Sequence, residues 1–139
     1  MTNNLILRVV SKSLIPLIIV FALYVQFHGD YGPGGGFQAG VIMSAAIILY
    51  ALVFGLDAGE QVIPSTMLRI LASLGVLIYA GVGVVTLFLG GNYLDYSVLG
   101  GTRVAGQHLG ILLVELGVGM TVFSVMLIIF FAFAGRGRP

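Results

Sequence analysis

The stretch His28-Gly-Asp-Tyr-Gly-Pro-Gly-Gly-Gly-Phe-Gln-Ala-Gly40 separates two long apolar runs and holds six of the 21 glycines of the chain. Glycine favours no single backbone conformation and proline lacks an amide hydrogen, so a helix that enters this stretch must end there. A phosphate-binding loop is the other interpretation of so many glycines, but no strand-like segment precedes the stretch and no Gly-Lys-Ser/Thr follows it. The stretch therefore predicts a tight turn between two helices.

The composition indicates that these helices lie in a membrane. Of the 139 residues, 59% are hydrophobic and only 8% are charged, and the mean hydropathy is +1.13. Soluble domains carry about 25% charged residues. The net charge of +1 points to no nucleic-acid partner, and the absence of cysteine excludes thiolate metal sites, disulfides and thiol catalysis.

Four apolar runs are long enough to cross a hydrocarbon core of about 30 Å, which takes about 20 helical residues. They cover approximately residues 5–27, 37–56, 66–89 and 106–134. We therefore predict an all-α integral membrane protein with four transmembrane helices in a single membrane domain, residues 1–139. The first run lacks a small-residue cleavage site, so we expect a retained helix rather than a signal peptide.

The cationic residues are distributed unevenly around these four runs. With the N-terminus inside, Arg103 alone lies outside, and five cations lie at or near the cytoplasmic side: Arg8, Lys12, Arg69, Arg136 and Arg138. Lysine and arginine are enriched at the cytoplasmic ends of membrane helices. We therefore predict that both termini face the cytoplasm (N-in/C-in), that the glycine-rich turn lies outside, and that the protein resides in the cell membrane.

Glu115 is the one carboxylate inside an apolar run. Counted from Gly106, it should lie about 13 Å along its helix, near the bilayer middle, where an acidic residue costs about 2.5 to 3.5 kcal/mol. Glu115 is either a relay site for protons or cations, or a protonated or paired group that locks its helix to a partner subunit. His108 lies two turns earlier on the same face. It is either part of a proton-accessible line or an interfacial residue that caps the helix.

His28, at the start of the turn, also has a structural and a functional interpretation. His28 either ends the first helix and fixes the loop, or takes part in ion access. We expect the following segment to be a packing device that brings the first two helices close together. It consists of Pro33, Gly34, Gly35, Gly36 and Phe37. Two histidines do not supply a metal site, and we predict neither a metal nor a cofactor.

Small residues recur along every predicted helix. Gly106 and Gly110 form a GxxxG pair, Gly40 and Ser44 form a similar pair, and Gly75 thins the third helix. In lipid, helices associate through close backbone packing at such residues. We therefore expect these positions to be helix–helix contacts, in larger number than a four-helix monomer needs, which favours burial in a larger assembly.

Two segments resemble the B subunit (MrpB/MnhB family) of Mrp-type multisubunit sodium/proton antiporters. They are Pro-Gly-Gly-Gly-Phe-Gln-Ala-Gly at 33–40 and the run from Gly106 to Val122, which contains His108 and Glu115. The resemblance extends over residues 5 to 133. The Pro-Gly-Gly-Gly-Phe positions, Glu115 and His108 carry over from the family more directly than Asp30.

The resemblance implies a small, non-enzymatic membrane subunit without a redox cofactor. Such a subunit supports assembly of an antiporter that exchanges Na⁺ for H⁺ in pH homeostasis, and an ion or proton path along it is one implied role. Its partners would be large subunits like the pump subunits of respiratory complex I, together with other small membrane subunits. Two alternatives stay open: a subunit of a related hydrogenase-type complex, and a stand-alone homo-oligomeric channel or carrier built around Glu115.

Overall fold

The computed structural model describes residues 4–32 and 34–137, and every regular element in these residues is helical. Four helices are long and apolar enough to cross a membrane, which confirms the predicted all-α membrane fold. They are α1 (Leu5–Phe27), α2 (Gly36–Phe54), α4 (Ser65–Phe88) and α5 (Arg103–Ala134). Between them lie α3 (Leu56–Val62) and η1 (Tyr96–Val98), and η2 (Gly135–Gly137) follows α5.

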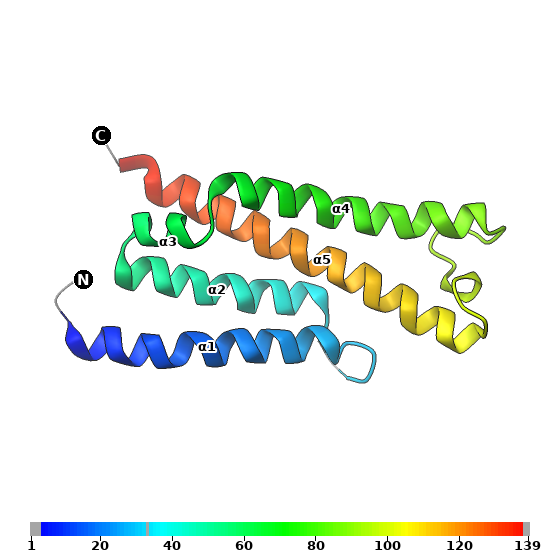
Figure 1. Ribbon diagram of the computed structural model, residues 1–139, viewed down its shortest axis with the longest axis horizontal. Coiled ribbons are helices and arrows are strands. Elements are labelled where there is room, and N and C mark those ends of the chain that lie inside the picture. Colours follow the sequence, from blue (N-terminus) through cyan, green and yellow to red (C-terminus); the bar gives the residue numbers. More distant parts are fainter. Residues whose placement is uncertain (1–3, 33, 138–139) are drawn as a thin grey trace.

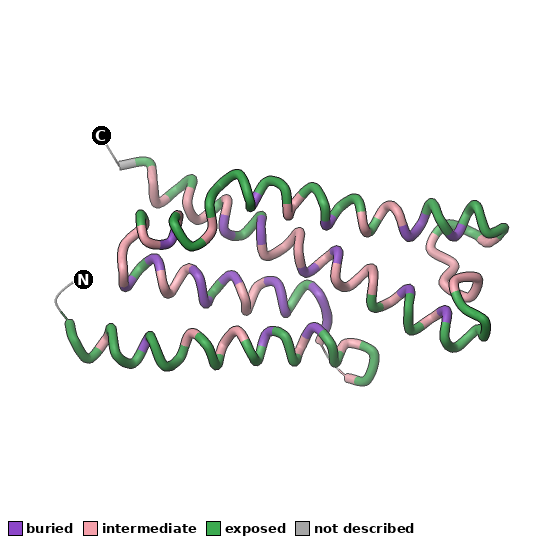
Figure 2. The backbone as a smooth tube through the Cα atoms, viewed as in Figure 1, coloured by how far each residue is buried: buried purple, intermediate pink, exposed green. Residues whose placement is uncertain are grey.

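The long helices lie side by side in the order α1, α2, α5, α4 (Figure 1). The last helix thus packs between the second and the fourth, and α1 forms one edge of the row. Buried positions concentrate where neighbouring helices face each other, and α1 is largely exposed (Figure 2). Ile47, Leu68 and Leu127 form a core cluster where α2, α4 and α5 meet.

Two helix ends differ by two or more residues from the approximate bounds predicted from the sequence. The second run was expected to continue to residue 56, but α2 ends at Phe54 and the chain turns at Gly55, whose φ of +107° is readily adopted only by glycine. The short α3 follows at once. The last helix begins at Arg103, three residues earlier than predicted, because the Thr102 side chain accepts a hydrogen bond from the Ala105 amide at 3.3 Å.

The small residues confirm the expected helix packing at two of three places. Gly40 packs against α5, where a Cβ would lie 2.7 Å from the Gly119 carbonyl oxygen, and Gly75 packs against α5 at Gly117. Within residues 4–32 and 34–137, the nearest neighbours of Gly106 and Gly110 do not come from another long helix. The two glycines accommodate Tyr96 instead, because η1 folds back over the start of α5.

The connection between α4 and α5 is fixed to α4 through a buried threonine. The Thr86 side chain is fully buried, donates to the Gly83 carbonyl at 2.8 Å and accepts from the Leu94 amide at 3.0 Å. Leu94 has a φ of +61°, which is unfavourable for a residue with a branched side chain. The hydrogen bond to Thr86 therefore helps to hold this turn.

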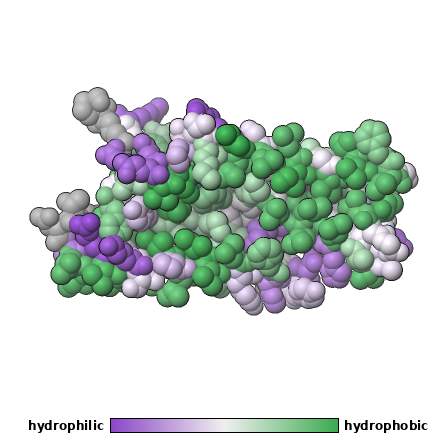
Figure 3. Space-filling model, viewed as in Figure 1, coloured by the Kyte–Doolittle hydropathy of each residue, from purple (hydrophilic) through white to green (hydrophobic). Residues whose placement is uncertain are grey.

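Most of the visible surface along the bundle is hydrophobic (Figure 3). Hydrophilic residues gather at the end that carries both termini and at the turn between α1 and α2. Such a pattern suits a chain whose middle contacts lipid or other apolar helices.

Candidate functional site

The carboxyl group of Glu115 lies against the backbone of the turn between α1 and α2. A Cβ on Gly29 would lie 2.6 Å from Glu115 Oε1, and one on Gly35 would lie 2.7 Å from the same atom. A Cβ on Gly36 would lie 2.8 Å from the Glu115 backbone carbon. The three glycines therefore form a seat that no larger residue could form without displacing Glu115 or α5. We call Gly29, Gly35 and Gly36 the glycine seat.

Glu115 lies level with the turn between α1 and α2, although it is more than three helical turns from the start of α5. The reason is that α4 and α5 project beyond the turn between α1 and α2 (Figure 1). The depth of Glu115 near the middle of the membrane stays a prediction. The part of α5 from Glu115 to Ala134 alone spans about 29 Å, close to a whole hydrocarbon core. Glu115 thus sits toward the turn end of the bundle.

Asp30 and His108 meet beside the glycine seat. His108 Nδ1 lies 2.8 Å from Asp30 Oδ2; the His108 side chain is 50% exposed and the Asp30 side chain is 16% exposed. Gly29 touches Glu115, and its neighbour in sequence, Asp30, contacts His108. Glu115 and His108 lie two turns apart on α5. The turn therefore runs along α5 and contacts both predicted site residues.

His28 joins this region through its ring but lies apart from Glu115. Its ring stacks on Tyr24 at 5.0 Å and faces Tyr31 at 6.1 Å, and Tyr31 in turn stacks on His108 at 6.2 Å. The rings form a continuous row from the end of α1 to α5. In the described parts of the chain, no three His, Asp or Glu side chains lie close enough together to hold a metal ion.

The predicted packing motif divides into two parts. Gly35 and Gly36 contact Glu115, and Gly34 lies against the side chain of Val25. Phe37 is 61% exposed, so its ring points away from the bundle. Pro33 lies outside the described residues.

Asp30 was given less weight from the sequence than Glu115 and His108, although it directly follows the glycine that touches Glu115. A second polar residue of the region, Gln26, was missed. Gln26 is 8% exposed, its Oε1 atom lies beside Gly119, and its Nε2 atom has no hydrogen-bond partner among the described residues. An amide in the last turn of an apolar run was the available signal for Gln26.

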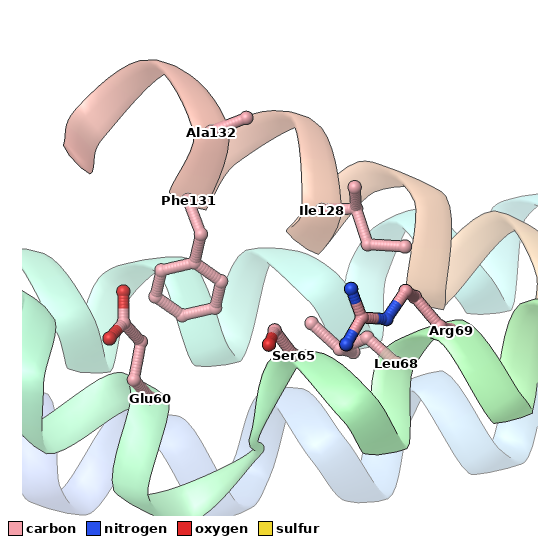
Figure 4. Close-up of a pocket in the computed structure, with 7 residues that line it drawn as sticks. All are labelled: Glu60, Ser65, Leu68, Arg69, Ile128, Phe131 and Ala132. Carbon is pink, nitrogen blue, oxygen red and sulfur yellow. The ribbon is translucent and has the colours of Figure 1, made fainter. Parts of the chain in front are cut away.

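A separate hollow of about 290 Å³ lies at the end of the bundle that carries the termini. Figure 4 shows Glu60 and Arg69 reaching it from opposite sides, with the Phe131 ring between them. Leu68, Ile128 and Ala132 supply apolar walls. None of the predicted site residues lines this hollow, so the glycine seat with Glu115 is the better candidate for a functional site.

Residues 6–128 match the model of a family described as a domain related to the MnhB subunit of Na⁺/H⁺ antiporter. Two similar curated proteins are the putative antiporter subunits mnhB2 of Staphylococcus aureus strains Newman and USA300. Each is 32% identical to this chain over 136 residues, which is 96% of both chains.

Proposed function

The chain belongs to the family of domains related to the MnhB subunit of Na⁺/H⁺ antiporters, and on this premise we propose how it contributes to exchange. It is a small subunit of a multisubunit Na⁺/H⁺ antiporter, which confirms the resemblance predicted from residues 33–40 and 106–122. The comparisons favour neither a hydrogenase-type host complex nor a stand-alone channel. The family is one of transporter subunits rather than of enzymes.

We propose that Glu115 binds and releases a proton during exchange. The observation that carries this proposal is the packing of its carboxyl group against the glycine seat, at the turn end of the bundle. Within residues 4–32 and 34–137, Glu115 forms no salt bridge. An unpaired carboxylate removed from water is costly, so a bound proton or cation stabilises the group.

Asp30 and His108 supply the access to Glu115 in this proposal. Histidine can accept and donate a proton, and His108 is half-exposed while its ring nitrogen contacts the carboxyl group of Asp30. Because Asp30 follows Gly29, a proton held at this pair is one residue away from the backbone that touches Glu115. His28 has a more distant role, since its ring reaches the pair only through Tyr31.

The distribution of cationic residues supports one orientation of the chain in the membrane. We propose the cell membrane as the location, with both termini in the cytoplasm, because Arg8, Lys12, Arg69 and Arg136 lie toward the end of the bundle that carries the termini. The turn between α1 and α2 would then face outward.

The exposed apolar side of α1 supports contact with other antiporter subunits, which would be large subunits like those of complex I and small membrane subunits.

The test is Glu115→Gln in the complete antiporter complex, with Asp57→Asn as a control at the other end of the bundle. Complex recovery is measured by co-purification, and Na⁺/H⁺ exchange is measured in sealed vesicles. We expect normal recovery, an exchange rate reduced at least about tenfold in Glu115→Gln, and little change in the control. A wild-type exchange rate in a fully assembled Glu115→Gln complex would contradict the proposed proton-relay role of Glu115. Loss of assembly in Glu115→Gln would instead support a purely structural glutamate.

A further inference from the structure

The hollow of about 290 Å³ at the end of the bundle that carries the termini brings two opposite charges to one place. Glu60 of α3 and Arg69 of α4 reach it from opposite sides, and the Phe131 ring of α5 lies between them (Figure 4). Arg69 is exposed and Glu60 is half-buried. A molecule that carries one negative and one positive group is therefore complementary to this hollow.

A shallow apolar groove continues from Arg69 along α4. Its lining consists of Arg69, Ile70, Ser73, Leu74 and Leu77, so Arg69 borders both the hollow and the groove. Ile70, Leu74 and Leu77 are 60%, 44% and 66% exposed. They extend to the middle of a helix that is long and apolar enough to cross a membrane, so an acyl chain can cover them.

Arg69 lies at the level where a membrane helix meets phospholipid headgroups. It is about 6 Å from the start of α4, and arginine side chains near helix ends extend into the headgroup layer. Its guanidinium group carries five N–H donors, of which one donates to Thr66 Oγ1 at 3.4 Å. Because guanidinium groups bind phosphate through parallel hydrogen bonds, the position and charge of Arg69 suit a lipid phosphate.

The other side of the hollow suits an ammonium group. A carboxylate has about four acceptor positions, so Glu60 can bind an ammonium group in addition to any partner within the chain. The face of an aromatic ring also attracts a cation, and the Phe131 ring lines the same hollow. This ring is held against α3, since a Cβ on Gly59 would lie 3.3 Å from it. Glu60 and Phe131 thus offer two favourable contacts to one cation.

We propose that this hollow binds the headgroup of phosphatidylethanolamine, with the phosphate at Arg69 and the ammonium group at Glu60 and Phe131. One acyl chain lies in the groove along α4. Phosphatidylcholine fits less well, because its ammonium group has no N–H to donate to Glu60. Phosphatidylglycerol lacks a positive group altogether. The lipid site is independent of the proposed role of Glu115, which lies toward the turn end of the bundle.

Zero-length cross-linking tests the lipid site in the complete antiporter complex. The complex is placed in vesicles of phosphatidylethanolamine and phosphatidylglycerol, and a carbodiimide joins carboxyl groups to the lipid amines that contact them. Mass spectrometry of the peptides measures the lipid attached to each carboxyl group. Asp57 is the internal control, because it is exposed on α3 and is not among the described residues that line the hollow. We expect lipid to attach to Glu60 at least about five times faster than to Asp57, since only Glu60 faces the bound ammonium group.

Two variants show whether Arg69 holds the phosphate. Arg69→Gln leaves Glu60 in place but should lower its rate of lipid attachment at least about fivefold, while Arg69→Lys should retain part of it. The matched control is Arg136→Gln at the same end of the bundle. The Arg136 guanidinium carbon lies 5.5 Å from the centre of the Phe133 ring, and Arg136 is not among the described residues that line the hollow. Lipid attachment in Arg136→Gln should equal that of wild type.

Three results would overturn the lipid site. They are equal lipid attachment to Glu60 and Asp57 in the wild-type complex, unchanged attachment in Arg69→Gln, and a cross-link from Glu60 to a lysine of another subunit in place of lipid. The last result would show that a protein partner covers the hollow. If Arg69→Gln does not assemble, the comparison of Glu60 with Asp57 in the wild-type complex decides. Lipid attachment is measured whether or not the complex transports ions, so its outcome is separable from that of the exchange assay.

Discussion

His108 Nδ1 lies 2.8 Å from Asp30 Oδ2, a contact that joins the first turn of the chain to its last long helix across 78 residues. Beside it, Glu115 rests on Gly29, Gly35 and Gly36. The two contacts together attach the turn to α5 over two helical turns. Their energies can be measured separately, because one depends on polar side chains and the other on the absence of side chains.

The Asp30–His108 contact should contribute modestly to stability. The His108 side chain is 50% exposed, and exposed ion pairs are worth about 0.2 to 1 kcal/mol. We expect Asp30→Asn and His108→Gln each to lower the thermal stability of the complex slightly, and the double variant to lose less than the sum. A double-mutant cycle on the purified complex gives the coupling. Strictly additive losses would show that the two side chains do not interact.

The glycine seat should tolerate no side chain at Gly36. A Cβ there would lie 2.8 Å and 2.9 Å from backbone atoms of Glu115 and Gly119, which cannot rotate away. Overpacking of this kind costs about 1 to 3 kcal/mol or more, so Gly36→Ala should reduce recovery of the subunit in the complex.

The matched control for the seat is Gly81→Ala in α4. A Cβ at Gly81 meets nothing within 4 Å, and alanine is favoured over glycine within helices by about 1 kcal/mol. Recovery of the Gly81→Ala subunit should equal or exceed that of wild type. Equal recovery of Gly36→Ala and Gly81→Ala would show that the seat is not tightly packed.

Thr86→Val should loosen the connection between α4 and α5. Valine preserves the shape but leaves the half-buried Leu94 amide without its acceptor. A fully buried donor without a partner costs about 1 to 3 kcal/mol, so the loss here should lie at or below the lower end of that range. Hydrogen exchange measured by mass spectrometry should become faster in the peptide that contains Leu94. Thr86→Ser keeps the hydroxyl group and should retain wild-type protection. Unchanged exchange in Thr86→Val would mean that other contacts hold the turn.

The same connection should respond to acid. Hydrogen bonds from the Ser97 hydroxyl group and backbone amide lower the pKa of Asp95 from its usual 3.8. The resulting stabilisation is present above about pH 3.8 and is lost as the pH falls through the lowered value. In Ser97→Ala, cleavage of this connection by pepsin should therefore begin at a higher pH than in wild type. Ser73→Ala, on the exposed side of α4, is the control and should cleave as wild type does.

The spans could be predicted from the sequence because each one rests on local composition. Residues 5–27 were predicted with the observed bounds, since the apolar run and the glycine-rich turn define both ends. The short α3 was missed because Leu56–Val62 contains Asp57, Gly59 and Glu60, which are typical of a loop. The early start of α5 was predictable in principle from Thr102, a favourable capping residue.

The site was only partly predictable because its geometry depends on contacts distant in sequence. Glu115 and His108 stood out as polar groups in an apolar run, and their shared face followed from helical spacing. The residues that contact them could not be predicted, because nothing local to Asp30 or Gly29 indicates that α5 lies beside these two residues. The level of Glu115 relative to α1 and α2 was not predicted, because the projection of α4 and α5 beyond the turn depends on helix packing and not on local sequence.

The position of α5 between α2 and α4 also sets the order in which the protein can be completed. The ribosome delivers the two helices that flank the glycine seat long before it delivers Glu115. Until the C-terminal helix enters the bilayer, the seat stands open and α2 and α4 lack their common neighbour. A chain interrupted before α5 would therefore contain three membrane spans without the helix that contacts both α2 and α4. The faces of α2 and α4 that α5 normally covers would stay exposed in such a chain.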